Sequence, residues 1–96
     1  MNEKVELSII TVNYNGLADT RDLVNSVLNL VFPFSFEVIV VDNASRENEA
    51  EVLKREFPSI IILRSEKNMG FARANNLGIK HSSGEFLYFL NNDALL

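Results

Sequence analysis

Short apolar runs alternate with segments that have apolar residues at helical spacing, and this alternation constrains the fold more than any other feature. Four runs read as strands, at residues 7–12, 36–41, 60–63 and 86–90. The three segments between them, at residues 18–31, 46–57 and 70–80, read as amphipathic helices. Repeated strand–helix units give parallel strands joined by right-handed crossovers. The sequence therefore predicts a three-layer α/β/α, Rossmann-like domain around a mostly parallel four-stranded sheet.

Capping residues and prolines set the expected helix ends. Asp19 or Thr20 is expected to cap the first helix, and Pro33 helps to end it. Ser45 and Asn68 are expected to cap the second and third helices. The buried face of the first helix is expected to carry Leu23, Val24, Val27, Leu28 and Val31.

Composition excludes several classes of protein. The chain has 96 residues, which is enough for one small domain, and 47% of them are hydrophobic, which is too many for a disordered segment. The net charge is −4 and the basic residues are scattered, so we expect no nucleic-acid surface. The absence of cysteine excludes disulfides and zinc–thiolate sites, and it fits a cytoplasmic location. We also expect no membrane span, because no run is long and apolar enough.

Polar residues follow the strands where an open parallel sheet binds its ligands, at the carboxyl ends. The first strand leads to Thr11, Asn13 and Tyr14, and the second leads to Asp42 and Asn43. The Asp42 carboxylate can accept hydrogen bonds from a ribose hydroxyl or a base N–H, or it can serve its own backbone in an Asx turn.

Asn91-Asn92-Asp93 follows the fourth apolar run, residues 86–90, which reads as a strand buried on both faces. Two amides and a carboxylate suit a hard divalent cation held between protein oxygens and phosphates. The competing interpretation is a polar turn, because Asn and Asp favour turns.

The segment that starts the third helix also has two interpretations. Asn68 can simply cap the helix, whereas the N–H groups of the helix terminus also suit a phosphate. Gly70 would let a ligand approach the backbone closely, and Gly78 is interpreted as a contact between helix and sheet. A Gly-x-Gly-x-x-Gly motif after the first strand and a Walker lysine motif are both absent from the sequence.

Four segments together resemble the start of a family 2 glycosyltransferase of the GT-A fold. They are SIITVNYNG at residues 8–16, VIVVDNAS at residues 38–45, NMGFARANNLGI at residues 68–79 and FLNND at residues 89–93. They occur in the same order along the chain as in the family, and their sequences are most similar to those of its rhamnosyltransferase-like branch.

The resemblance implies a nucleotide-sugar donor, UDP- or dTDP-linked, and a divalent metal, Mg²⁺ or Mn²⁺. It implies that Asp93 meets the metal and that Asn91 replaces the first Asp of the Asp-x-Asp signature, which removes one charge. The remaining donor contacts that it implies are Thr11, Asn13 and Tyr14 around the nucleoside, Asp42 at the base or ribose, and Asn68 and Gly70 beside the nucleotide.

The resemblance further implies sugar transfer, with inversion, to a cell-surface polysaccharide, another glycan or a lipid-linked acceptor, in the cytoplasm or at the inner membrane face. We expect residues 1–96 to be a donor-binding part of a longer enzyme whose catalytic base lies beyond residue 96, and to be inactive alone. Apolar side chains near the end, Phe86, Tyr88, Phe89, Leu95 and Leu96, are expected to favour self-association.

Two other functions stay open at this point. One is a non-catalytic nucleotide-binding or interaction module, because the fold alone assigns no function. The more distant one is a dehydrogenase, since Asp42 follows the second strand where such enzymes place a ribose-binding acid.

Overall fold

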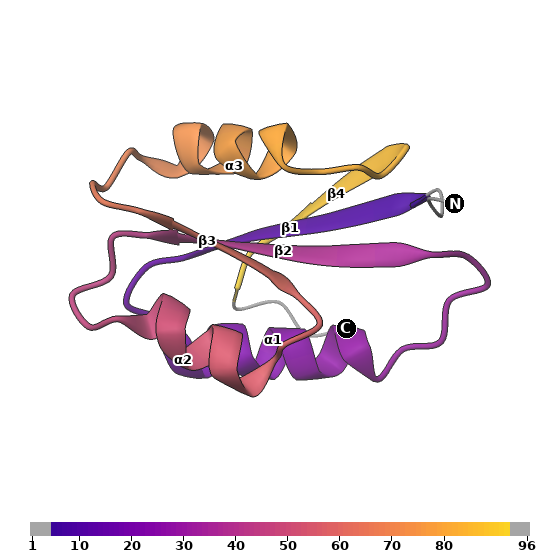
Figure 1. The fold of residues 1–96 in the computed structure, drawn as a ribbon, viewed down its shortest axis with the longest axis horizontal. Coiled ribbons are helices and arrows are strands. Elements are labelled where there is room, and N and C mark those ends of the chain that lie inside the picture. Colours follow the sequence, from indigo (N-terminus) through magenta and orange to yellow (C-terminus); the bar gives the residue numbers. More distant parts are fainter. Residues whose placement is uncertain (1–4, 93–96) are drawn as a thin grey trace.

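The computed structural model describes residues 5–92, which form a four-stranded parallel sheet between two layers of helices (Figure 1). The strand order is β3-β2-β1-β4, and each neighbouring pair is parallel. Helices α1 and α2 cover one face of the sheet and α3 covers the other (Figure 1). The element bounds are β1 (Leu7–Asn13), α1 (Leu17–Leu28), β2 (Phe36–Asn43), α2 (Glu49–Glu56), β3 (Ile61–Ser65), α3 (Phe71–Lys80) and β4 (Phe86–Leu90). The predicted three-layer α/β/α fold is confirmed.

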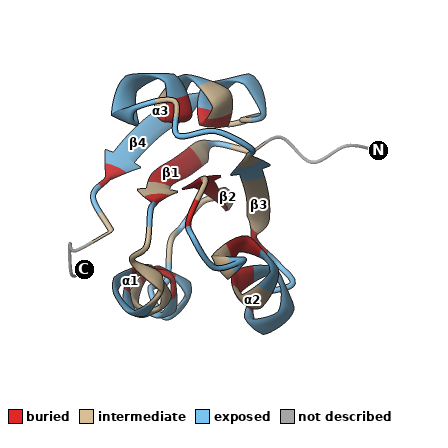
Figure 2. Cartoon of the chain, turned by 90° about the vertical axis from the view of Figure 1, so that its left-hand side faces the viewer, coloured by how far each residue is buried: buried red, intermediate tan, exposed pale blue. Residues whose placement is uncertain are grey.

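The core lies on both faces of the two central strands, β1 and β2, which Figure 2 shows as buried between the helices. Successive side chains of a strand point to opposite faces. Ile9 accordingly packs with α1 and α2, whereas its neighbour Ile10 packs beneath α3. Burial on both faces explains why these strands read as continuous apolar runs. Within residues 5–92, no helix is long and apolar enough to cross a membrane.

Strand β4 lies at the edge of the sheet, and this position corrects one expectation. Its first four side chains are exposed, whereas Leu90 is buried. The prediction of a strand buried on both faces is wrong for the part of the chain that the structure describes. The reason is the strand order, which leaves β4 with one neighbour, β1, while α3 packs against β1 and β2.

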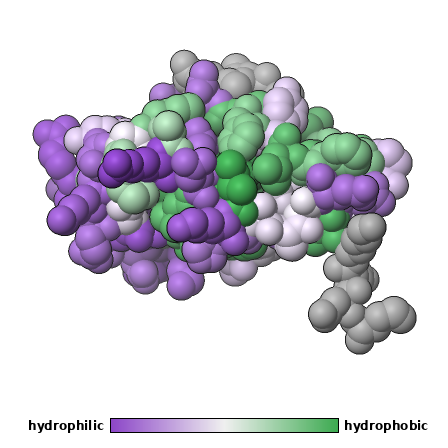
Figure 3. All heavy atoms as spheres, turned by 90° about the horizontal axis from the view of Figure 1, so that it is seen from above, coloured by the Kyte–Doolittle hydropathy of each residue, from purple (hydrophilic) through white to green (hydrophobic). Residues whose placement is uncertain are grey.

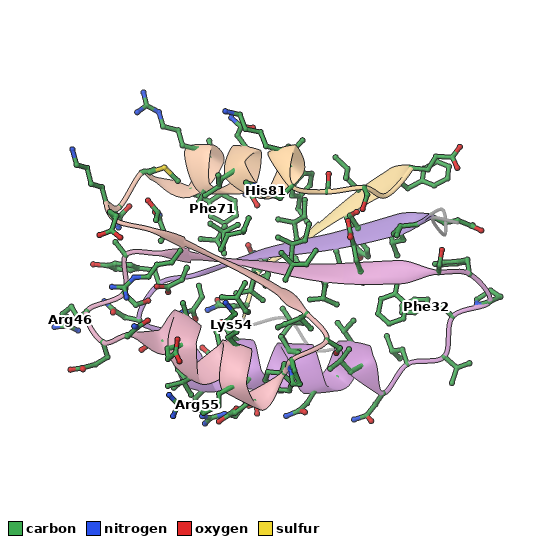
Figure 4. The ribbon with its side chains drawn as sticks, in the orientation of Figure 1. Phe32, Arg46, Lys54, Arg55, Phe71 and His81 are labelled. Atoms are coloured by element: carbon green, nitrogen blue, oxygen red, sulfur yellow. The ribbon has the colours of Figure 1, made fainter. Side chains whose placement is uncertain are left out.

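The first helix is shorter than predicted. It ends at Leu28, and Val31 is 94% exposed rather than buried. Phe32 packs against the core instead, in an aromatic cluster with Phe34 and Phe36 whose ring centroids lie 5.2 and 4.8 Å from its own (Figure 4). Phe32, which is larger and one position later, therefore makes the core contact that helical spacing predicted for Val31.

The predicted caps of all three helices also differ from the observed ones. The residues at the N-cap positions are Gly16, Asn48 and Gly70. Thr20 and Ser45 do not cap because their hydroxyls are engaged elsewhere: Thr20 Oγ1 donates to Asn13 Oδ1, and Ser45 Oγ accepts from Asn13 Nδ2 and Asn15 N. Tertiary hydrogen bonds have overridden the local capping preference of both residues.

An ion pair ties α1 to α2 at the surface. Arg21 donates from Nε and Nη2 to the two carboxylate oxygens of Glu56, each at 2.7 Å. The hydrogen bond from Arg21 holds the pKa of Glu56 below its usual value, and the same bond raises the pKa of Arg21. Both side chains are 38% exposed, so solvent screens the pair and its contribution to stability is small.

Helix α3 lies close to the sheet at Gly78. A Cβ atom at this position would lie 2.7 Å from Cγ2 of Ile10 and 3.3 Å from Cγ2 of Val41. Both neighbours are β-branched and cannot easily rotate away. The interpretation of Gly78 as a contact between helix and sheet is confirmed.

We predict that Gly78→Ala lowers the free energy of unfolding by about 1–3 kcal/mol, because overpacking at the sheet outweighs the better helix propensity of alanine. The matched control is Asn76→Ala, at an exposed position of the same helix, which is expected to be neutral or slightly stabilising. Urea unfolding of the wild type and the two variants measures the difference in the free energy of unfolding. A Gly78→Ala chain as stable as the wild type would contradict the close packing of α3.

Candidate functional site

The carboxyl ends of β1, β2 and β4 lie side by side, as predicted. In the register of the sheet, Asn13 pairs with Asp42 and Thr11 pairs with Leu90. The strand order also reverses here, because β2 lies on one side of β1 and β4 on the other. Such a reversal is the usual ligand-binding position of an open α/β sheet.

A cavity of about 380 Å³ opens at this edge of the sheet. Its wall is formed by Val12, Tyr14, Asn43, Asn68, Phe71, Asn91 and Asn92. Amides and aromatic rings dominate this wall, and none of these lining side chains carries a charge. Tyr14 and Phe71, which starts α3 (Figure 4), are 49% and 58% exposed, so their rings are accessible to a ligand.

The amino end of α3 borders the cavity without a side-chain cap. Gly70 occupies the N-cap position with φ of 81°, and no atom lies within 4 Å of the place where its Cβ would be. Asn68 Oδ1 accepts hydrogen bonds from Gly70 N at 2.9 Å and from Asn43 Nδ2 at 3.1 Å. Asn43 Oδ1 in turn accepts from Met69 N at 2.9 Å. These bonds fix the turn before α3 against the end of β2 and leave the first N–H groups of α3 available to an anion.

Three of the predicted donor contacts lie beneath the cavity rather than in its wall. Thr11, Asn13 and Asp42 are each at most 1% exposed. Side chains alternate along a strand, so Asn13 and Asp42 point toward α1 and α2, whereas Val12 and Asn43 point toward the α3 side, where the cavity lies. The predicted contacts at Tyr14, Asn68 and Asn91 do lie in the wall.

The carboxylate of Asp42 is the centre of a buried polar network. Its Oδ1 accepts hydrogen bonds from Asn13 Nδ2 at 2.9 Å and from Ser45 Oγ at 2.5 Å, and its Oδ2 accepts from Ser45 N at 3.4 Å. Asn13 also donates to Glu49 Oε1 at 2.9 Å and accepts from Thr20 Oγ1 at 2.6 Å. The bond to the Ser45 backbone is the local turn that the sequence offered as the second interpretation of Asp42.

The two loops above this network are joined and strained. Asn15 and Ala44 adopt left-handed backbone conformations, with φ of 50° and 63°, which cost a non-glycine residue about 1–2 kcal/mol. Asn15 N donates to Ser45 Oγ at 2.9 Å, and Asn15 Oδ1 accepts from Arg46 N at 2.8 Å. Strain of this kind often marks functional loops.

Sequence reasoning did not assign Asn43 or Phe71 to the wall of the cavity. Asn43 was noted as a neighbour of Asp42, but the alternation of the strand would have shown that it faces the other side, where Val41 packs beneath α3. Phe71 carries a detectable signal, because a large exposed aromatic at the first residue of a helix has no role in the core. Thr11 is the opposite case, because it was predicted as a donor contact but lies beneath the cavity, and its buried Oγ1 has no hydrogen-bond partner among residues 5–92.

The candidate metal motif is described only in part. Asn91 and Asn92 lie in the cavity wall, and Asp93 lies outside the described residues. Within residues 5–92 no group of three His, Cys, Asp or Glu side chains is placed to hold a metal ion. Mg²⁺ and Mn²⁺ in nucleotide sites need fewer protein ligands, because one or two protein oxygens and the substrate phosphates complete the coordination shell. The amide oxygen of Asn91 fits this chemistry.

Comparison with known proteins gives one matching family. The model of glycosyl transferase family 2 matches residues 8–96. An uncharacterized glycosyltransferase of Haemophilus influenzae is 37% identical over 87 residues, which are 91% of this chain and 29% of that protein. The putative teichuronic acid biosynthesis glycosyltransferase TuaG of Bacillus subtilis is 32% identical over 95 residues, 96% of this chain and 37% of its own length.

Two solved structures share the fold. S. aureus TarS 1–349 in complex with UDP-GlcNAc has a TM-score of 0.82 and 28% identity, over 93% of this chain and 27% of that one. The mannosyltransferase PcManGT of Pyrobaculum calidifontis, in complex with GDP-Man and Mn²⁺, has a TM-score of 0.85 over 98% of this chain and 29% of its own, and at 23% identity it shows the fold alone. The chain thus spans no more than 37% of any of these four proteins. Because the family model covers residues 8–96, the chain belongs to glycosyl transferase family 2.

Proposed function

We propose that this chain is the nucleotide-sugar-binding part of a glycosyltransferase and that the donor lies in the cavity at the ends of β1, β2 and β4. The observation that carries the proposal is the position of this cavity at the reversal of strand order, next to the uncapped amino end of α3. A ligand there meets aromatic faces, amides and free N–H groups, which match the base, the ribose and the diphosphate of a nucleotide.

We propose that different wall residues contact the base, the ribose and the diphosphate of the donor. Tyr14 and Phe71 have exposed rings on which a base can stack. Asn43 and Asn68 present amide N–H groups that can donate to a base edge, whereas their Oδ1 atoms already accept hydrogen bonds within the chain. The N–H groups at the start of α3, beside Gly70, suit a phosphate. The UDP-GlcNAc complex of TarS supports a uridine nucleotide, and a thymidine nucleotide is the alternative.

A divalent cation, Mg²⁺ or Mn²⁺, would be held by Asp93 and by the amide oxygen of Asn91, together with the donor diphosphate. When bound, it would offset the negative charge that the leaving diphosphate gains as the sugar–phosphate bond breaks. An amide in place of a carboxylate at Asn91 removes one negative charge. The affinity for the cation is therefore expected to be lower than in a site with two carboxylates.

The acceptor side is proposed to come from another part of the protein. Inverting transfer needs a general base for the acceptor hydroxyl, and the lining residues of the cavity include no carboxylate and no histidine. We propose that the base lies outside the described residues and that residues 1–96 alone bind the donor without transferring it. TuaG supports a cell-surface polysaccharide as the acceptor. The rhamnosyltransferase-like branch and a cytoplasmic or inner-membrane location stay predictions.

The direct test is a calorimetric titration of the chain with UDP and dTDP, with and without Mn²⁺. We expect one of the two nucleotides to bind, more tightly with Mn²⁺ than without it, and Asp93→Ala to remove the gain. Tyr14→Ala is expected to weaken binding about 10-fold, because base stacking on an aromatic ring contributes about 1–3 kcal/mol. Tyr88→Ala is the matched control, since Tyr88 is equally exposed at 50% but lies outside the cavity wall.

Other outcomes of this titration would contradict the proposal. Nucleotide binding with the same affinity in the presence and absence of Mn²⁺ would favour a non-catalytic module. Tighter binding of NAD than of UDP or dTDP would favour a dehydrogenase. Equal binding by the wild type and Tyr14→Ala would show that the nucleotide lies elsewhere.

The exposed edge of the sheet supports a proposal about self-association. Phe86, Leu87, Tyr88 and Phe89 are 65, 40, 50 and 43% exposed, and β4 contains no charged residue or proline that would protect its edge. Figure 3, which views the molecule from the α3 side, shows apolar atoms gathered across this face. Leu95 and Leu96, which were expected to add to this surface, lie outside the described residues.

We predict that the chain self-associates at high concentration through β4. Phe86→Lys should shift the sedimentation coefficient toward that of a monomer, because a lysine at an edge strand opposes pairing. Val31→Lys is the matched control, as it places the same charge at an exposed apolar residue of the α1–β2 connection, outside β4. A wild-type chain that sediments as a monomer at every concentration would refute this prediction.

A further inference from the structure

Thr20 joins the end of β1 to the segment that follows β4. Its side chain is fully buried in α1. The hydroxyl donates to Asn13 Oδ1 at 2.6 Å and accepts from Asn92 Nδ2 at 3.3 Å. A hydroxyl has one proton to donate and lone pairs to accept with, so the two bonds are compatible.

Gly16 provides the space that this connection needs. A Cβ atom at Gly16 would lie 2.6 Å from Asn92 Nδ2. The φ angle of Gly16 is −127°, which any residue can adopt, so the backbone does not require glycine here. The need for a small residue at this position comes from the Asn92 side chain.

The connection continues into the network beneath the cavity. Asn13 Nδ2 donates to Asp42 Oδ1, which also accepts from Ser45 Oγ. Ser45 Oγ in turn accepts from the backbone N–H of Asn15. A continuous series of hydrogen bonds therefore runs from the segment after β4 to the loops after β1 and β2. Asn92 lies in the cavity wall with Asn91, which precedes it in the sequence, and Asp93 follows it.

We infer that Thr20 and Asn92 are positioning residues that fix Asn91 relative to the nucleotide cavity. This inference rests on the proposed function. Asn92 is thus assigned to anchoring, whereas its neighbour Asn91 is left free to face the donor. Loss of the anchor releases Asn91, whose amide oxygen is proposed to meet the cation, but it leaves Tyr14, Phe71 and the amino end of α3 in place.

The test compares three variants of the 96-residue chain. Thr20→Val removes the hydroxyl and keeps the branched shape, Thr20→Ser keeps the hydroxyl, and Gly16→Ala displaces Asn92 without removing any hydrogen-bonding group. In ¹H–¹⁵N spectra without ligand, the Asn92 side-chain amide should shift in Thr20→Val and Gly16→Ala and should stay in place in Thr20→Ser. Gly16→Ala also carries the test if Thr20→Val does not fold.

The second readout is the affinity of the UDP complex for Mn²⁺. We expect it to fall about 10-fold in Thr20→Val and Gly16→Ala, which is the low end of the range for groups that orient metal ligands. Thr20→Ser should keep the wild-type affinity for Mn²⁺. The affinity for UDP without Mn²⁺ should change less than about 2-fold, because the remaining cavity contacts persist; this is the difference that separates positioning from general loss of structure.

The possible outcomes separate a failure of the positioning inference from a failure of the proposed function. If wild-type binding depends on Mn²⁺ but both variants keep the wild-type amide shift and Mn²⁺ affinity, the inference is overturned and the proposed function stands. Equal losses of UDP affinity with and without Mn²⁺ would also overturn it. A wild-type chain without Mn²⁺-dependent UDP binding would overturn the proposed function and the inference with it.

Discussion

The buried carboxylate of Asp42 is the interaction on which the site depends. Its hydrogen bonds to Asn13 and Ser45 join the end of β1 to the loop after β2, and the loops after both strands contain a left-handed residue. A carboxylate buried in this way is stable only when its oxygens are satisfied, and Asp42 has three such bonds. With the loops fixed, Tyr14 and Asn43 are presented to the same cavity.

Strand alternation decides which polar residues can reach a ligand. Asp42 and Asn43 are adjacent in the sequence, yet one lies in the network on the α1 and α2 side and the other in the cavity wall. The same division separates Asn13 from Val12 on β1. The site therefore has two layers: amides and rings line the cavity, and the buried Asp42 carboxylate with its hydroxyl and amide partners lies beneath them.

Much of the fold followed from local patterns, whereas the site followed only in part. The strand at residues 86–90 was predicted with its observed bounds, because a compact apolar run between a turn and Asn91 leaves little freedom. That its side chains are exposed could not be predicted, since edge position depends on the order of strands. Thr20 and Ser45 were predicted as caps because the sequence shows local preferences but not the partners in other segments, which are Asn13 for Thr20 and the Asn15 N–H for Ser45. The face of Asp42 was predictable in principle from the apolar neighbours of β2.

The most direct test of the account is to map UDP binding residue by residue, with ¹H–¹⁵N spectra of the chain recorded at increasing UDP concentration. The account predicts the largest shifts at Tyr14, Asn43, Asn68, Gly70 and Asn91, at the carboxyl ends of the strands. Shifts concentrated at the opposite end of the sheet, around Phe32 and the start of β2, would contradict it.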